Sequence, residues 1–494
     1  MGTAVECERG AGAVKELLRR ALADNAARTA VVEASSGDET TYRELERLVV
    51  GLGLALSPYG SHVLVIVTQK SALYYAAVVR CLMLELPFCC IDEDTPPRRI
   101  SEICQQLENP LVLGSLSDPS LLESIAVLLP SDISPTDAQL KSGDPNPDAP
   151  YYVATSGSTG RPKLIKGRQA SLSHFARWAI PFYGVDSSTR WAQFSSTGFD
   201  LTLVDIVTVL SAGGMLVALH SRFDRLVPTM AIKRFGVTHW HSVPSAIPYL
   251  LAPVKSRNEA QSVVVFTFCG EPLFPQPVES LMNAYPGARI INTYGPTEGT
   301  LFFMAHEVAP QDLQYETIPL GEPIPGWTIL LQPSPGYGEL ECTICSDLIA
   351  FGYLGLDGGQ FGCTSIDGET TRAFRTGDLL RLKDDKLFFV RRNDRMVKVH
   401  GIRIDLGEIE AFARTAGAAN PVAFKDGEYL HLVYERSPQN PTQSELAQVC
   451  GERLAKPLVP SLFSEVDLLP RNLNGKLNHQ EIQVQLAKYR NEES

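Results

Sequence analysis

Residues 151–163 read Tyr-Tyr-Val-Ala-Thr-Ser-Gly-Ser-Thr-Gly-Arg-Pro-Lys, an apolar strand-like run that passes directly into a loop of hydroxyl side chains and glycines. Gly157 and Gly160 permit left-handed backbone angles and a close approach of the main chain to a ligand. Four hydroxyl groups stand in the same stretch, on Thr155, Ser156, Ser158 and Thr159. Such a loop suits phosphate oxygens, although it lacks the Gly-Lys-Ser/Thr ending of a P-loop. The same composition also fits a plain Ser/Gly linker.

Four further motifs follow this loop in a definite order. They are Asn-Thr-Tyr-Gly-Pro-Thr-Glu at 292–298, Phe-Arg-Thr-Gly-Asp-Leu at 374–379, Arg-Asn-Asp at 392–394 running into Val-Lys-Val-His-Gly at 397–401, and Asn-Gly-Lys at 474–476. With the first loop, this set resembles the adenylate-forming superfamily, which comprises amino-acid adenylation domains, acyl-CoA synthetases and luciferases. The resemblance extends from residue 41 to residue 476. Each motif is weak by itself, but five in order at family-like spacing make a chance match improbable.

The composition limits the class of protein. At 494 residues the chain is long enough for two or more domains, and 44% hydrophobic with 20% charged residues is ordinary for a globular protein. The net charge of −12, with no offsetting stripe of Lys and Arg, argues against nucleic acid as a partner. No apolar run reaches the roughly 20 residues of a membrane span, and the N-terminus lacks the apolar core of a signal peptide. We therefore expect no membrane partner and a cytoplasmic location.

The cysteines and histidines give only weak indications of a metal site. The ten cysteines are scattered in mostly apolar surroundings, which indicates small buried side chains in a reducing compartment. Cys342 and Cys345 have zinc-like spacing, but no second Cys/His pair lies at a fitting distance. His239 and His241 share one face of a predicted strand and are able to ligate a metal, although packing beside a pocket is the stronger interpretation.

The hydrophobic pattern predicts an α/β protein with a separate C-terminal unit. Residues 1–393 alternate helix-like and strand-like segments. We expect helices at 13–25 and 71–84, and strands at 61–67, 215–219, 262–268 and 288–291. After Asp394 a compact unit follows, with a strand at 396–400 and helices at 407–416 and 444–454. The resemblance implies an N-terminal domain of α/β subdomains (1–393) that holds ATP and the amino acid, and a mobile α+β C-terminal lid domain (394–494) with its hinge at Asp394.

The resemblance also implies a site for ATP and Mg²⁺. The first loop would hold the β- and γ-phosphates, Tyr294 would stack on adenine, Asp378 would accept from the ribose hydroxyls, and Glu298 would help to hold Mg²⁺. The nucleotide-binding residues are then Thr155, Ser156, Gly157, Ser158, Thr159, Gly160, Lys163, Asn292, Thr293, Tyr294, Gly295, Thr297, Asp378 and Arg392. Leu164 departs from the family, in which a glycine usually follows the lysine. Each of three residues also has a simpler interpretation when taken alone. Lys163 would be a solvated charge on a loop, Glu298 would be an acid that caps a helix, and Asp378 would be a turn residue.

Three residues of the last two motifs match the family's catalytic and hinge positions. Lys476 follows an Asn-Gly turn that would place it at the tip of a loop, where its ammonium would bridge the substrate carboxylate and the α-phosphate. Lys398 matches a residue used in the thioester-forming orientation, and Asp394 matches the hinge acid. Met396 stands where the family usually has glutamine, which we expect to alter only local bonding.

The segment that begins with Phe199 and Asp200 indicates the substrate class. In amino-acid adenylation domains a Phe-Asp pair opens this segment, and the acid pairs with the substrate ammonium. An aspartate ahead of an apolar run also fits a helix N-cap. The resemblance predicts a pocket lined by Phe199, Asp200, Leu201, Val204, Ser242, Thr267, Cys269, Gly270, Thr293, Leu301 and Phe302. Apart from Asp200 this lining carries no charge, so we expect a small or medium neutral amino acid, of α or β type.

Three functions compete at this point. The first is ATP-dependent activation of an amino acid to its aminoacyl-AMP with release of pyrophosphate, then transfer to the phosphopantetheine thiol of a separate carrier protein. That activity would belong to a stand-alone adenylation domain of the nonribosomal peptide synthetase type, with antibiotic or other secondary-metabolite assembly as its natural pathway. The second is an acyl- or aryl-CoA synthetase that forms a CoA thioester. The third is a non-catalytic binding module that retains the fold.

Overall fold

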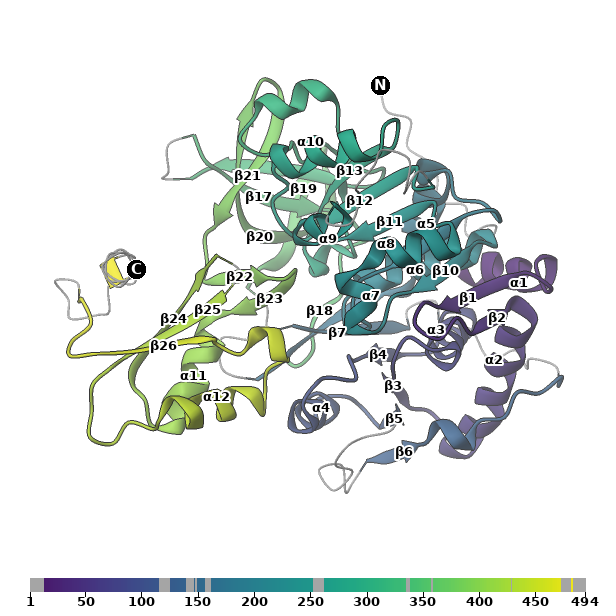
Figure 1. Ribbon diagram of the computed structural model, residues 1–494, viewed down its shortest axis with the longest axis horizontal. Coiled ribbons are helices and arrows are strands. Elements are labelled where there is room, and N and C mark those ends of the chain that lie inside the picture. Colours follow the sequence, from purple (N-terminus) through teal and green to yellow (C-terminus); the bar gives the residue numbers. More distant parts are fainter. Residues whose placement is uncertain are drawn as a thin grey trace.

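The computed structural model describes residues 13–114, 125–138, 146, 149–155, 161–251, 262–334, 338–356, 359–427, 429–471 and 481–482. Figure 1 shows a large α/β part formed by the N-terminal residues and a smaller α+β part at the C-terminal end. The predicted fold class is therefore confirmed. No helix among the described residues is long and apolar enough to cross a membrane.

A nine-stranded sheet forms one layer of the large part. Its order is β15 (Glu322–Pro323), β14 (Met304–Glu307), β13 (Arg289–Tyr294), β12 (Val265–Cys269), β11 (His239–Ser242), β9 (Arg190–Gln193), β10 (Met215–Ala218), β1 (Thr29–Glu33) and β2 (Glu39–Thr41). The strands from β13 to β1 run parallel. Because helices cover parallel sheets on both faces, these strands are buried along most of their length, and β11 and β12 are buried at every residue.

A seven-stranded sheet forms the second layer. Its order is β18 (Gly352–Tyr353), β8 (Lys163–Arg168), β7 (Pro150–Thr155), β4 (Phe88–Cys90), β3 (Val63–Val67), β5 (Pro110–Gly114) and β6 (Ala126–Leu128). A further five-stranded sheet contains β16 (Thr328–Pro333), β17 (Leu340–Cys345), β20 (Glu369–Lys383), β19 (Phe361–Ile366) and β21 (Lys386–Arg392).

Two helices between the large sheets are buried on almost every side. They are α3 (Ala72–Leu84) and α6 (Leu201–Val209), whose sequences are mostly apolar, as expected for helices without a solvent face. The main core joins them to strands of both sheets, for example Ile66 in β3 and Trp191 in β9. The other helices of the large part are α1 (Val14–Asp24), α2 (Tyr42–Leu56), α4 (Pro97–Cys104), α5 (Gln169–Tyr183), α7 (Arg222–Leu226), α8 (Pro228–Phe235), α9 (Ile247–Leu251) and α10 (Pro275–Ala284).

The C-terminal part has its own core. A hairpin of β22 (Met396–Val399) and β23 (Ile402–Asp405) leads into α11 (Leu406–Ala416). A three-stranded sheet of β24 (Ala419–Asp426), β25 (Tyr429–Glu435) and β26 (Leu462–Val466) packs with α11 and α12 (Gln443–Gly451). The connection from β21 to β22 contains Asp394, where the sequence predicts the hinge; the boundary and the hinge role stay predictions.

The predicted elements are present, with ends that differ by up to three residues. The helices expected at 13–25 and 71–84 are α1 and α3, and the strand expected at 61–67 is β3. The strand expected at 262–268 begins only at Val265, and the helix expected at 444–454 ends at Gly451. Element ends are where local sequence patterns carry least information, because capping and tertiary contacts decide them.

Candidate active site

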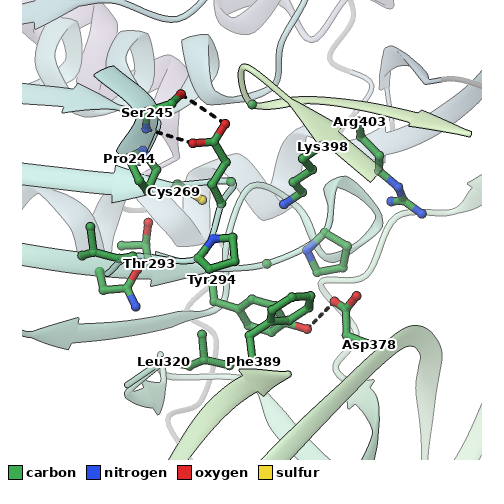
Figure 2. A pocket seen from close by; sticks show the side chains of 18 of the residues that line it. Pro244, Ser245, Cys269, Thr293, Tyr294, Leu320, Asp378, Phe389, Lys398 and Arg403 are labelled. Carbon is green, nitrogen blue, oxygen red and sulfur yellow. Dashed lines mark hydrogen bonds between the residues drawn. The ribbon is translucent and has the colours of Figure 1, made fainter. Parts of the chain in front are cut away.

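A cavity of about 700 Å³ opens where the carboxyl ends of β12 and β13 face the β22–β23 hairpin (Figure 2). Ligands of open α/β sheets bind at such strand ends. Both parts of the chain contribute to the wall of the cavity, because it is lined by residues 199–201, 269–274 and 292–297 and also by residues 396–398, 401 and 403. Residues of three of the five motifs, those at 292–298, 374–379 and 392–401, therefore border one space, although they lie far apart in the sequence.

Tyr294, Asp378 and Arg392 form one hydrogen-bonded group at the cavity wall. The Tyr294 hydroxyl donates to Asp378 Oδ2 at 2.5 Å, and the Tyr294 ring lies beside Phe389 and Leu320 (Figure 2). Asp378 and Arg392 face each other across β20 and β21, and the Arg392 guanidinium pairs with the Asp378 carboxylate. An aromatic face beside an acceptor carboxylate is an arrangement that fits a nucleoside, with the base on the ring and the ribose hydroxyls at the acid.

The predicted hinge acid belongs to the same group. Arg392 donates to both Asp394 oxygens, at 2.7 Å from Nε to Oδ1 and 2.6 Å from Nη2 to Oδ2. Burial acts against the charged carboxylate, but the Arg392 hydrogen bonds outweigh it and hold the pKa of Asp394 below its usual value. Asp394 is therefore ionised and fixed in the connection between the two parts.

Glu298 is a buried carboxylate held by two donors. It lies in the short 3₁₀ helix η6 (Thr297–Gly299); its Oε1 accepts from the Tyr353 hydroxyl at 2.6 Å, and its Oε2 lies 3.0 Å from Arg403 Nη1. Burial alone would raise the pKa of Glu298, but Arg403 and Tyr353 outweigh burial and lower it. An ionised carboxylate is the hard oxygen donor that Mg²⁺ prefers, so the chemistry of Glu298 fits the implied metal, although Arg403 here supplies the positive charge.

The two ends of the first loop belong to paired antiparallel strands. Thr155 at the end of β7 pairs with Lys163 at the start of β8, and the Thr155 hydroxyl donates to the Lys163 carbonyl at 3.3 Å. Lys163 Nζ lies 5.8 Å from the centre of the Tyr353 ring, beside the donor of Glu298. The remaining loop residues of the prediction lie outside the described residues, as does the predicted catalytic lysine: Ser156, Gly157, Ser158, Thr159, Gly160 and Lys476.

Asp200 is a buried acid on the cavity wall. It occupies the N-cap position of α6, yet its side chain makes no capping hydrogen bond, so the structure does not support the alternative of a simple cap. Only 7% of the residue is exposed. Burial raises the pKa of Asp200 to about 6, against the opposing effect of a hydrogen bond from Thr297. The described residues form no salt bridge with Asp200, and a bound ammonium would supply its missing partner.

The predicted pocket residues fall into two groups. Those that line the cavity are Phe199, Asp200, Leu201, Cys269, Gly270, Thr293 and Leu301. The others are buried and are not part of the cavity wall: Val204, Ser242, Thr267 and Phe302. Phe302 packs edge-on against Phe175 with ring centres 4.9 Å apart, and Trp240 donates to Ser242 at 2.8 Å. These four residues lie in the packing behind the wall, so the cavity is shallower than the full predicted set implies.

Backbone strain marks the turn that shapes the pocket. Thr300 and Leu301 have φ values of +55° and +70°, which are uncommon for residues other than glycine. A Cβ at Gly295 would lie 2.5 Å from Phe302 Cα, so the chain segments here approach too closely for any side chain. Asn292 donates to the Pro319 carbonyl at 2.8 Å and Thr293 to the Phe268 carbonyl at 3.0 Å, which fixes the strand below the turn.

The β22–β23 hairpin closes the cavity from the other side. Lys398 points into the cavity, toward Cys269 (Figure 2), and burial lowers its pKa. Gly401 has φ +78°, and a Cβ there would lie 2.2 Å from Val243 Cγ1, so the hairpin is packed tightly against the N-terminal part. The role of Lys398 in thioester formation, which the family resemblance implies, stays a prediction.

Tyr353 and Arg403 are site residues that the sequence reasoning missed. Arg403 is directly opposite Lys398 in the hairpin register, so the two side chains share a face. Arg403 lies two residues after the 397–401 motif, and strand alternation on both sides of its glycine is a signal that identifies it. Tyr353 lies in none of the five motifs, so no sequence signal identifies it.

His239 and His241 are buried in the packing of the large part. His239 Nε2 lies 3.1 Å from the Tyr183 carbonyl, and His241 Nδ1 lies 2.7 Å from Asp205 Oδ1.

Comparisons with known proteins agree with this geometry. The AMP-binding enzyme family profile matches residues 18–334. The D-alanine--D-alanyl carrier protein ligase of Staphylococcus epidermidis is 28% identical over 476 residues, which are 92% of this chain and 95% of that protein. The ligase of the same name from Staphylococcus aureus is 27% identical over 413 residues, covering 79% of this chain and 83% of that protein.

Two solved structures show the same fold. One is the Vibrio cholerae adenylation domain AlmE in complex with glycyl-adenosine-5'-phosphate, with a TM-score of 0.82 and 20% identity over 99% of each chain. The other is holo-PA1221, an NRPS protein containing adenylation and PCP domains bound to a vinylsulfonamide inhibitor, with a TM-score of 0.82 and 22% identity over 96% of this chain and 84% of that one. At these identities the likeness establishes the fold.

Proposed function

This chain belongs to the AMP-binding enzyme family, and from that premise we propose that it activates a small neutral amino acid with ATP and transfers it to a separate carrier protein. In the first step a carboxylate oxygen attacks the α-phosphorus, the bond to the β-phosphate oxygen breaks, and pyrophosphate leaves. In the second step a phosphopantetheine thiol attacks the aminoacyl carbonyl, gives up its proton, and AMP leaves.

The observation that carries the proposal is the buried Asp200 on the cavity wall. A carboxylate there without a salt-bridge partner is costly, and a substrate ammonium would offset that cost. Fatty and aryl acids lack an ammonium and would leave Asp200 unpaired. This difference favours an amino acid over the substrates of the alternative, an acyl- or aryl-CoA synthetase.

The proposed binding site for ATP is formed by Glu298 and by the group of Tyr294, Asp378 and Arg392. Tyr294 would stack on adenine, Asp378 would accept from the ribose hydroxyls, and Lys163 would lie near the terminal phosphates. Mg²⁺, when bound through Glu298, would neutralise charge on the phosphate oxygens. The protein's own contribution is to align two anions and exclude water around them.

The shallow cavity supports a small side chain. Leu201, Cys269 and Leu301 line it, while Phe302 belongs to the packing behind. Both relatives carry D-alanine in their names, so alanine is our first candidate, with the D form preferred. The same names mention a carrier protein and do not bear on secondary metabolism, which stays a prediction. ATP dependence and the free, mostly buried cysteines suit the cytoplasm as the location.

A substrate panel tests this function. Purified protein is assayed for ATP–pyrophosphate exchange with D-alanine, L-alanine, glycine, β-alanine, leucine, propionate and benzoate, and then for loading of a phosphopantetheinylated carrier protein. We expect exchange with alanine far above that with propionate, its des-amino analogue, and weak exchange with leucine. Exchange driven best by propionate or benzoate would instead establish the CoA synthetase alternative, and no exchange with any acid would favour a binding module.

A further inference from the structure

The Glu298–Arg403 ion pair joins the two parts of the chain. Glu298 comes from η6 in the N-terminal part, and Arg403 comes from β23 in the C-terminal part. Arg403 Nη1 lies 3.0 Å from Oε2 and 3.3 Å from Oε1, while Tyr353 donates to Oε1 at 2.6 Å. The Glu298 side chain is 1% exposed and that of Arg403 16% exposed. Both carboxylate oxygens are therefore occupied by protein donors, away from bulk water.

The position of Arg403 is tied to that of Lys398. The two residues are paired across β22 and β23, and the tight contact of Gly401 with Val243 fixes the turn that joins these strands. A two-stranded hairpin moves as one piece because its ladder hydrogen bonds hold the register. When Lys398 lies in the cavity, Arg403 lies at Glu298, and when the hairpin leaves, both side chains leave.

A buried carboxylate is costly unless a cation compensates its charge, and the like charges of Arg403 and a divalent cation would repel each other at the same carboxylate. We propose that Arg403 is a positioning residue that takes the place of the divalent cation at Glu298, so that the hairpin docks only when the cation has gone. The inference rests on the proposed function and its hinge. Glu298 thus binds a metal ion while the hairpin is away from the cavity. It pairs with Arg403 while Lys398 is in the cavity. Release of the metal with pyrophosphate is then coupled to the arrival of the lysine used for thiol transfer.

A second ion pair between the parts provides a control. Arg99 in α4 pairs with Glu408 in α11, and the two side chains are 11% and 0% exposed. This contact also joins the two parts of the chain, but it is distinct from Glu298 and its two donors. Loss of Arg99 should therefore weaken docking without changing the competition at Glu298.

The test measures docking directly by fluorescence energy transfer. Dyes are placed at Ser280→Cys in α10 and Ser444→Cys in α12, in a Cys7→Ser, Cys363→Ser background. The non-cleavable analogue α,β-methylene-ATP is added with Mg²⁺ or with EDTA, and no amino acid is present. In the parent protein we expect Mg²⁺ to reduce the docked population. Because the readout needs no amino acid, it is independent of whether the proposed substrate is correct.

Three variants decide the outcome. In Arg403→Gln the docked population should become insensitive to Mg²⁺, and by reciprocity the apparent affinity for Mg²⁺ should rise about 5-fold or more. In Arg99→Gln docking should be weaker but should keep its full response to Mg²⁺. Arg403→Lys, which keeps a charge without the planar fork, should restore part of the response, and it carries the test if Arg403→Gln fails to fold. An unchanged Mg²⁺ response in the Arg403 variants, or an equal loss in Arg99→Gln, overturns the inference.

Discussion

Replacement of Asp200 by asparagine tests the proposed role of this acid in substrate binding, because it removes the charge at nearly constant shape. The side chain is buried on the cavity wall, and the described residues offer it no salt-bridge partner. Removing one member of a buried ion pair costs about 3–5 kcal/mol, and 1.4 kcal/mol corresponds to a factor of ten. We therefore expect kcat/KM for the amino acid to fall by at least about 10²-fold in Asp200→Asn.

The assay is ATP–pyrophosphate exchange with the amino acid and ATP varied separately. The KM for ATP should stay near that of the parent protein, because the predicted nucleotide-binding residues Tyr294 and Asp378 are untouched. Asp186→Asn, the same chemical change at an exposed aspartate that does not line the cavity, is the matched control and should lose far less. A loss below about tenfold in Asp200→Asn, or an equal change in the KM for ATP, would refute the role of Asp200 as the ammonium partner.

Three further predictions follow from the same site. Because burial raises the pKa of Asp200 to about 6, its charged form is lost as pH falls through that value, so kcat/KM for the amino acid should drop below about pH 6; the pH profile of Asp200→Asn should lack this limb. Lys476→Ala should lower adenylate formation about 10²–10³-fold while ATP binding, measured by calorimetry, persists, and exchange within a few-fold of the parent would contradict that role. Asp394→Pro fixes φ near −65°, and it should reduce carrier loading far more than pyrophosphate exchange; equal loss of both rates would show that rotation at this residue does not separate the two steps.

The sequence predicted the family and the fold well. Five motifs in order indicated the adenylate-forming superfamily, and the family match and the two sheets confirm it. The strand β3 and the helix α3 could be predicted because each is a mostly apolar run between clear breaks. The run is short in the strand and long in the helix. Such local patterns predict the structure because an apolar run is stable only where its side chains are buried.

The details of the site were less accessible from sequence. The depth of the pocket depends on Phe302 packing against Phe175, a contact between residues far apart in the chain. The strained backbone at Leu301 has no sequence signal, because leucine rarely adopts a positive φ. The pairing of Arg403 with Glu298 depends on how the two parts lie together, which no local pattern specifies.

The central claim is that this chain makes an aminoacyl adenylate, and the most direct measurement is to detect that product. Purified protein is incubated with ATP, Mg²⁺ and D-alanine, or with propionate in its place, and the acid-quenched mixture is analysed by mass spectrometry. Since Asp200 would pair with the substrate ammonium, we predict alanyl-AMP with D-alanine and little or no propionyl-AMP. Propionyl-AMP in equal or greater amount, or no adenylate of any acid, would contradict the account.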